Sequence, residues 1–283
     1  MATFSSWFSN ARRWISDAGS RDGPRIGVAL GGGFARGIAH IGVLRVLEAA
    51  KIPIHAIAGV SAGSIIAAAY ASGATPTEIE AVALRMKFSD VARWTVNRMG
   101  LVDSRRMDSF LRRLLKAPHF EQMRVPLAVV ASDLTTGKPM VFRGRGDVYL
   151  PIRASCAYPG LFLPIRHQEH WLVDGMISME VPALPLRWMG ATHVISVALP
   201  SPVETVNPHH MLAVINRCFQ VLTARTEFEW RRYSNLVIAP DVSAVGWDSF
   251  GRTRELIEAG ESAARAALPS IRRWLRRRTG AAA

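Results

Sequence analysis

A serine between two glycines is the clearest chemical signal in this 283-residue chain: Gly59-Val60-Ser61-Ala62-Gly63. The preceding run, 55–60, is typical of a buried strand, and the following run, 63–71, is typical of a buried helix. A serine on a sharp strand-to-helix turn needs small neighbours two positions away on either side, because backbone and Cβ atoms crowd the turn. The positive end of the helix would also lie beside its hydroxyl. The pattern therefore predicts a nucleophile elbow that carries Ser61.

A second glycine-rich segment, Gly31-Gly32-Gly33-Phe34-Ala35-Arg36-Gly37, also lies between a predicted strand and a predicted helix. Consecutive glycines let backbone amides converge on an anion, such as a nucleotide phosphate, a pyrophosphate or the oxyanion of acyl transfer. The segment lacks the Gly-Lys-Ser/Thr of a P-loop, and Arg36 stands where the dinucleotide fingerprint needs a glycine. We therefore predict an oxyanion hole formed by Gly31, Gly32 and Gly33, with Arg36 close by.

A serine nucleophile needs a base, and two kinds are available in this chain. In the order of the α/β-hydrolases, which is serine, acid, histidine, the base would be His193, His209 or His210. The other candidate is Asp174, which ends a short apolar stretch and precedes Gly175. Acids at the carboxyl ends of strands face the active-site edge of α/β sheets, and apolar neighbours would raise the pKa of Asp174. The residues alone leave both kinds of base open.

Together these segments resemble the signature of the patatin-like phospholipases: the glycine loop at 31–37, the elbow at 59–63 and the Asp174-Gly175 pair. Segments 131–137 and 155–164 are similar to two further blocks of that family. The resemblance extends over residues 25–240 and is greatest to bacterial relatives of the neuropathy target esterase catalytic domain.

The resemblance implies a Ser–Asp dyad instead of a triad. Ser61 would attack an ester carbonyl, Asp174 would accept its proton, and the glycine loop would stabilise the oxyanion on the way to an acyl-enzyme. The implied activity is that of a serine lipid acyl hydrolase, a carboxylic ester hydrolase that acts on phospholipids or lysophospholipids. No cofactor and no metal ion is expected. Two residues depart from the family pattern: Met176 stands where a second glycine is usual, and Glu180 stands where relatives often carry asparagine.

The remaining apolar runs indicate the elements that position these residues. Helical patterns at 35–50, 77–85 and 104–115 alternate with short strands, which predicts an α/β domain with parallel pairing and helices on both faces of the sheet. The resemblance implies a three-layer α/β/α patatin-like fold with a central, mostly parallel sheet. The strands are expected at 25–30, 55–60, 126–132, 139–142, 170–173, 192–199 and 235–238.

Three local features concern burial. The run 52–77 is long enough to span a membrane, but glycines and serines at its centre favour a strand followed by a helix in a large core. Segment 87–102, which lies between predicted helices, is a candidate flap over the site. Cys156 and Cys218, the two cysteines of the chain, are expected to be reduced and buried.

By composition the chain divides into an amphipathic extension at 1–24, a catalytic domain at 25–240 and an arginine-rich helical tail at 241–283. The extension mixes aromatic residues with arginines, and the tail places Trp274 among five arginines. Such segments suit the interface of an anionic membrane, and docking of their aromatic faces on the domain is the alternative. We expect a cytoplasmic protein with peripheral membrane contact, because the N-terminus lacks the apolar core of a signal peptide.

The net charge is +13, from 35 Lys and Arg residues against 22 Asp and Glu residues. This excess favours an anionic partner or reflects the codon usage of a GC-rich genome. A membrane surface fits the Trp/Arg segments better than a nucleic acid, because the arginines are scattered and no zinc-ligand or RNA-binding signature occurs. Besides the lipid acyl hydrolase, we therefore consider a membrane-associated regulatory or scaffold protein of the same fold with little turnover. The same site would also suit a general esterase, a thioesterase or a transacylase.

Overall fold

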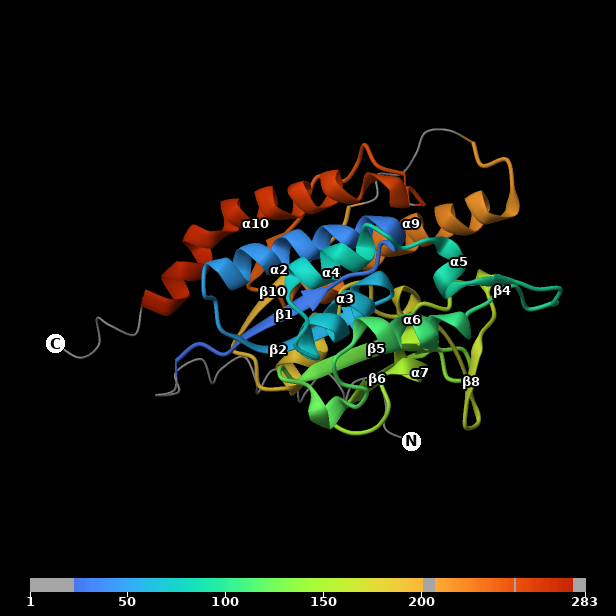
Figure 1. Cartoon of the computed structure of the whole chain (residues 1–283), viewed down its shortest axis with the longest axis horizontal. Coiled ribbons are helices and arrows are strands. Elements are labelled where there is room, and N and C mark those ends of the chain that lie inside the picture. Colours follow the sequence, from blue (N-terminus) through green and yellow to red (C-terminus); the bar gives the residue numbers. More distant parts are fainter. Residues whose placement is uncertain (1–22, 201–206, 247, 277–283) are drawn as a thin grey trace.

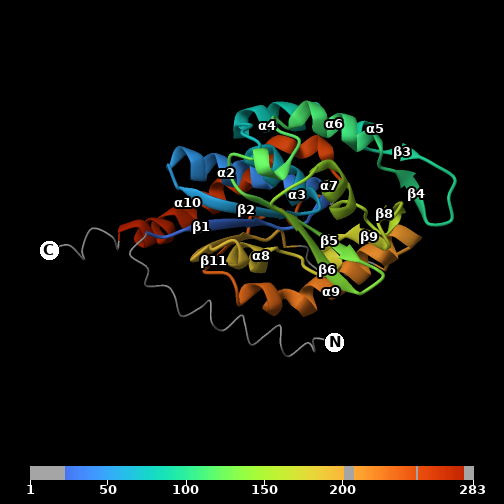
Figure 2. The same cartoon turned by 90° about the horizontal axis from the view of Figure 1, so that it is seen from below.

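An eight-stranded sheet forms the middle layer of the computed structural model, which describes residues 23–200, 207–246 and 248–276 (Figures 1 and 2). Its strands lie in the order β11-β10-β1-β2-β5-β9-β8, and β6 also pairs with β5. The strands are β1 (Ile26–Leu30), β2 (Ile54–Val60), β5 (Leu127–Asp133), β6 (Lys138–Arg143), β8 (Ile165–His167), β9 (His170–Asp174), β10 (His193–Val197) and β11 (Leu236–Ile238). Each of the seven strands expected from the sequence is present.

Parallel pairing extends from β11 through β10, β1 and β2 to β5, which confirms the predicted mostly parallel sheet. The remaining strands pair antiparallel: β6 and β9 with β5, and β8 with β9. The reason is the length of the connections. Residues 134–137 between β5 and β6 and residues 168–169 between β8 and β9 are too few for a crossover and can form only a hairpin.

Helices cover both faces of the sheet, which completes the predicted three layers (Figure 2). On one face pack α2 (Ala39–Ala49), α3 (Ala62–Ala71), α4 (Pro76–Ala83), α6 (Arg106–Leu114), α7 (Tyr149–Ser155) and α10 (Thr253–Arg276). On the other lie α8 (Ala183–Trp188) and α9 (Met211–Arg231). In β1, Ile26 and Val28 belong to the first core, whereas Ala29 belongs to the second, so small side chains let α8 approach the sheet closely.

The uncharged run 52–77 forms β2 and the buried helix α3, as predicted, and among the described residues no helix has the length and hydrophobicity needed to cross a membrane. Of the two cysteines, Cys156 is buried and Cys218 is exposed. The expectation that both are buried was therefore wrong for Cys218, which lies on the solvent side of α9.

The described part of the arginine-rich tail packs on the domain. A Cβ atom on Gly260 of α10 would overlap the carbonyl oxygen of Ala39 in α2, so the two helices touch backbone to backbone. Ile271 is fully buried, and the ring of Trp274 lies 4.8 Å from the ring of His193. The predicted extension, apart from residues 23–24, and the last arginines of the tail lie outside the described residues.

A second, three-stranded sheet lies beside the first. It contains β3 (Arg93–Trp94), β4 (Gly100–Asp103) and β7 (Gly160–Phe162), in that order. The β3–β4 hairpin follows the short helix α5 (Phe88–Val91) and projects from one end of the molecule (Figures 1 and 2). Most of the candidate flap, 87–102, is therefore this helix and hairpin.

Candidate active site

Ser61 lies on the tight turn between β2 and α3. Its backbone has φ 52° and ψ −128°, a region that residues other than glycine rarely adopt. A Cβ atom on Gly59 would lie 2.5 Å from the carbonyl oxygen of Gly63, and one on Gly63 would overlap that of Leu30. The turn is closed by Ser64, whose amide and hydroxyl donate to the Ser61 carbonyl at 2.8 and 2.6 Å. Close backbone contact therefore requires both glycines of the elbow.

Asp174 ends β9 and faces Ser61. The Ser61 hydroxyl donates to Oδ2 of Asp174 at 2.7 Å, and the amide of Met176 donates to Oδ1 at 3.0 Å. Ser61 is 5% exposed and Asp174 is 1% exposed. A Cβ atom on Gly175 would overlap the carbonyl oxygen of Val130, so a glycine is needed for β9 to end this close to β5. The nucleophile and the acid that the sequence singled out are thus in direct contact.

Burial controls the proton affinity of the acid. Loss of solvation raises the pKa of Asp174 to about 7, against the opposing effect of the hydrogen bonds from Met176 and Ser61. A carboxylate with a pKa near neutrality holds a proton more tightly than an ordinary one, which suits a general base that must take a hydroxyl proton.

The end of α7 holds both members of the pair. The hydroxyl of Ser155 donates to the carbonyl of Val130 at 2.6 Å and accepts the amide of Ser61 at 2.8 Å. Two residues further on, the carbonyl of Ala157 accepts the amide of Asp174 at 2.9 Å. The sequence contained Ser155 in a block of family resemblance but gave no signal for this role.

The glycine loop follows β1 and is fixed at its first peptide. The amide of Gly31 donates to Val197 at 3.0 Å and the amide of Gly32 donates to the carbonyl of Glu180 at 3.3 Å. Among the described residues, the Gly33 amide has no hydrogen-bond acceptor that meets the usual distance and angle limits. Of the three glycine amides expected in an oxyanion hole, those of Gly31 and Gly32 are thus engaged within the chain, and a role for the Gly33 amide stays a prediction.

The loop lies against the nucleophile. A Cβ atom on Gly32 would lie 3.3 Å from the Cβ of Ser61. Arg36, expected beside the oxyanion, is 7% exposed, and its Nε donates to the carbonyl of Val245 at 2.7 Å. This contact ties the loop to the segment before α10, and a role for Arg36 toward an anion stays a prediction.

His40 holds the glycine loop at the carbonyl of Gly31, a role that the sequence did not indicate. Its Nε2 lies 2.8 Å from the carbonyl oxygen of Gly31, which can only accept, so Nε2 carries the hydrogen. Burial lowers the pKa of His40 to about 4, and the ring is therefore neutral at physiological pH. The Gly31–Gly32 peptide is held at its oxygen by His40 and at its nitrogen by Glu180, which sets the direction of the next amide.

The two departures from the family pattern both contact Gly32. The side chain of Met176 lies directly over Gly32, at a place that a Cβ atom there would occupy. The carbonyl of Glu180 accepts the Gly32 amide, and its half-buried carboxylate accepts Nε1 of Trp230 in α9 at 3.0 Å. Burial raises the pKa of Glu180.

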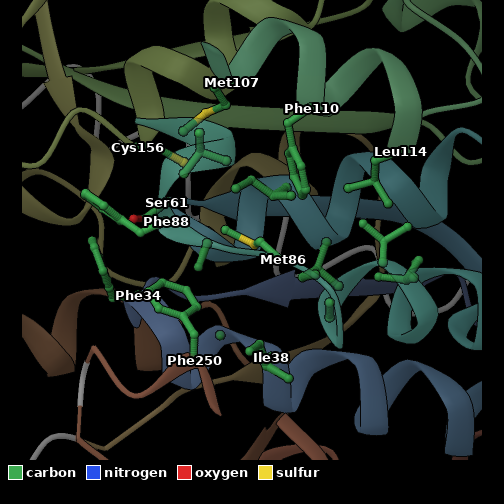
Figure 3. Close-up of a pocket in the computed structure, with 18 of the residues that line it drawn as sticks. Phe34, Ile38, Ser61, Met86, Phe88, Met107, Phe110, Leu114, Cys156 and Phe250 are labelled. Carbon is green, nitrogen blue, oxygen red and sulfur yellow. The ribbon is translucent and has the colours of Figure 1, made fainter. Parts of the chain in front are cut away.

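An apolar pocket of about 90 Å³ opens from Ser61 (Figure 3). Its walls come from α3, α4, α5 and α6, from the 3₁₀ turn at 34–38 and from Phe250, and Ser61 supplies the only hydroxyl among its lining residues. In this view Ser61 lies toward one end and Leu114 toward the other, with Met86 between them. The Cys156 thiol also lines the pocket, and burial raises its pKa far above the usual range.

A metal site is not apparent in the part of the chain that the structure describes, because no three His, Cys, Asp or Glu side chains cluster there. The local chemistry is that of a buried serine, a carboxylate of raised pKa and an apolar pocket. These groups can carry out acyl transfer without a bound ion.

Comparison with known proteins shows which proteins this chain resembles. A family model described as patatin-like phospholipase matches residues 28–187. An uncharacterised NTE family protein of Mycobacterium tuberculosis is 30% identical over 208 residues, which cover 71% of this chain and 57% of that protein. The lysophospholipase NTE1 of Cryptococcus neoformans is 32% identical over 189 residues, covering 65% and 12%. The match thus spans little more than half the length of the Mycobacterium protein and about an eighth of the Cryptococcus protein.

The fold also occurs in a solved structure. The crystal structure of VipD from Legionella pneumophila superposes with a TM-score of 0.50, at 14% identity, over 88% of this chain and 67% of that one. At this identity the likeness concerns the fold.

The raised pKa of Asp174 predicts a pH-dependent cost to stability. The folded state holds this proton up to about pH 7, whereas an unfolded aspartate releases it near pH 4. Between these values the wild type loses stability as pH rises, by up to about 1.4 kcal/mol per pH unit from this group. The asparagine of Asp174→Asn does not titrate in this range. The melting temperature of the variant relative to that of the wild type should therefore rise from pH 4 to 7 and stay constant above pH 7. Parallel curves would contradict the raised pKa.

The bridge through Ser155 predicts a structural role for one hydroxyl. Ser155→Ala leaves the Ser61 amide without its acceptor, which should lower the free energy of unfolding by about 1–3 kcal/mol and slow any reaction of Ser61. The matched control is Ser196→Ala, which removes a fully buried hydroxyl that contacts Ser234. Urea unfolding and labelling of Ser61 measure the two effects. If Ser155→Ala labels as fast as the control, the bridge does not position Ser61.

Proposed function

We propose a function for this chain, which belongs to the patatin-like phospholipase family. It is a serine acyl hydrolase that cleaves ester bonds of phospholipids or lysophospholipids. One observation carries the proposal: the hydrogen bond of 2.7 Å from Ser61 to the buried Asp174, made where an apolar pocket begins. A nucleophile, its base and a place for an acyl chain thus occur together.

In the first half of the reaction, the carboxylate of Asp174 takes the hydroxyl proton as Ser61 Oγ bonds to the ester carbonyl carbon. The carbonyl oxygen becomes an oxyanion, which the glycine loop stabilises through the amide of Gly33. When the intermediate collapses, the carbon–oxygen bond to the alcohol breaks and Asp174 returns its proton to the leaving alkoxide. The acyl group then remains on Ser61.

In the second half, water replaces the alcohol. Asp174 accepts a proton from the water molecule as the water oxygen bonds to the acyl carbon. The proton then passes to Ser61 Oγ when the bond between Oγ and the acyl carbon breaks. The products are a fatty acid and the free enzyme. A carboxylate is a weak base, so the fixed positions of Ser61, Asp174 and the loop must supply much of the acceleration.

The pocket supports a single acyl chain as the recognised group. Its walls are aliphatic, aromatic and thioether side chains, which offer burial to methylene groups and no hydrogen bond to a headgroup. The headgroup would then stay outside, at a lipid surface. The net charge of +13 supports an anionic surface, and the Trp/Arg segments at 1–24 and 270–278 remain predicted contributors.

A fluorophosphonate probe tests the proposed function directly, because it reacts with activated serines. We expect the wild type to label on Ser61, and Ser61→Ala and Asp174→Asn to remain unlabelled although folded. Since Asp174 must be ionised, the labelling rate should rise with pH and level off near pH 7, with a loss of about tenfold per pH unit below it. A flat profile down to pH 4 would exclude Asp174 as the base. No labelling of folded wild type would favour the scaffold function.

The position of Met86 predicts control over chain length. Met86→Trp places a larger side chain between Ser61 and the far end of the pocket (Figure 3). Hydrolysis of a palmitoyl ester should fall at least about tenfold relative to a butyryl ester, because a long chain needs the full pocket. The control is Met211→Trp, at a methionine that is 55% exposed on α9. Equal losses on both esters would place the acyl chain elsewhere.

A further inference from the structure

The β3–β4 hairpin exposes apolar side chains that folding does not require. Trp94 is 68% exposed, Met99 is 48% exposed and Val96, at the tip, is fully exposed. Large apolar side chains left this exposed on a projecting hairpin favour contact with a partner. The hairpin extends beyond the main sheet at one end of the molecule (Figures 1 and 2).

Two other segments enlarge this apolar surface. Leu134, in the turn after β5, is 57% exposed, and Trp171, in β9, is 39% exposed. Both line a shallow surface groove together with Met99 and Pro164. Met99 of the hairpin therefore meets Leu134 and Trp171 from two other parts of the chain. We call these three residues, together with the exposed Trp94 and Val96 of the same hairpin, the hairpin surface.

The exposed charges on the hairpin have one sign. Residues 91–102 contain Arg93 and Arg98, both exposed, and no Asp or Glu. Asp103, which pairs in register with Arg93, is only 8% exposed and binds Arg105 through both oxygens. Exposed arginines beside an exposed tryptophan match an anionic phospholipid interface, where the indole lies among headgroups and the guanidinium groups meet phosphates.

The hairpin is also continuous with the wall of the pocket. Phe88 lines the pocket, and its ring lies 6.3 Å from that of Trp94 and 6.0 Å from that of Phe162. Phe162 lines the pocket too, and it pairs in register with Val102 of β4. A bilayer that holds the hairpin would therefore lie beside the pocket that starts at Ser61.

We propose that the hairpin surface inserts into anionic phospholipid bilayers and thereby brings the acyl pocket to its substrate, an inference that rests on the proposed function. The shape favours a bilayer over a protein partner. A projecting tip can enter the headgroup layer by itself, whereas a stable protein interface needs about 800 Å² of complementary surface on each side.

Vesicle flotation measures the binding that this inference requires. We expect the wild type to bind vesicles of equal parts phosphatidylglycerol and phosphatidylcholine more tightly than pure phosphatidylcholine. Val96→Asp should weaken this binding about tenfold, because a carboxylate replaces an apolar tip near anionic headgroups. The matched controls are Val221→Asp and Phe228→Ala, at residues that are 46% and 63% exposed on α9, and they should bind like the wild type. Equal losses in hairpin and α9 variants would overturn the inference.

A local probe separates the hairpin from any other membrane-binding segment. Val96→Cys and, as a control, Phe228→Cys are each made in a Cys218→Ser chain and labelled with a polarity-sensitive fluorophore. On anionic vesicles the probe at position 96 should shift to shorter wavelength and become shielded from an aqueous quencher, and the probe at position 228 should not. If the chain binds vesicles while the probe at position 96 stays in water, another segment makes the contact and the inference fails.

Two activity measurements distinguish this inference from the proposed function. Val96→Asp should keep the wild-type rates of fluorophosphonate labelling and of hydrolysis of a soluble butyryl ester, and should lose about tenfold in hydrolysis of vesicle phospholipid. If the folded wild type does not label but its hairpin probe enters vesicles, the proposed function fails and the docking surface stands. If Val96→Asp hydrolyses vesicles like the wild type, the docking surface fails and the hydrolase stands.

Discussion

The burial of one carboxylate, that of Asp174, is the constraint that the rest of the site must accommodate. Asp174 is 1% exposed, and among the described residues only the Ser61 hydroxyl and the Met176 amide donate to it. Ionising such a group costs folding free energy, because two hydrogen bonds replace a full hydration shell. The same loss of solvation raises the pKa of Asp174 to about 7. The cost to stability and the raised proton affinity of Asp174 are therefore one physical effect, and the surrounding fold must be stable enough to tolerate it.

Hydrogen bonds hold the backbone of each part of the site at two points. Ser61 is held by its carbonyl, which accepts from Ser64, and by its amide, which donates to Ser155. The first peptide of the glycine loop is held at its oxygen by His40 and at its nitrogen by Glu180. Groups fixed at both ends need little reorganisation when charge develops, which is what the proposed mechanism requires of a site whose base is weak.

The sequence predicted what depends on local pattern. Glycine spacing identified the elbow and the loop, and apolar runs identified the strands. Asp174 was found for a reason that holds only in part, because β9 is antiparallel to β5 and the rule for parallel strand ends does not apply to it. Contacts between distant segments have no local pattern, so the roles of His40 and Ser155 were missed. Nor can sequence distinguish an exposed tryptophan such as Trp94 from a buried one such as Trp230.

Met176 and Glu180, the two departures from the family pattern, contact the site through their backbone groups. Met176 contributes its backbone amide to Asp174, and Glu180 contributes its backbone carbonyl to Gly32. Any residue with these backbone angles can supply the same groups, so substituting the side chains leaves the hydrogen bonds of the dyad and the loop in place. Substitution would change the side chain packed against Gly32, which is that of Met176, and the hydrogen bond that the Glu180 carboxylate accepts from Trp230. Variation at these two positions therefore acts on the space beside Gly32 and on α9, while the hydrogen bond between Ser61 and Asp174 is kept.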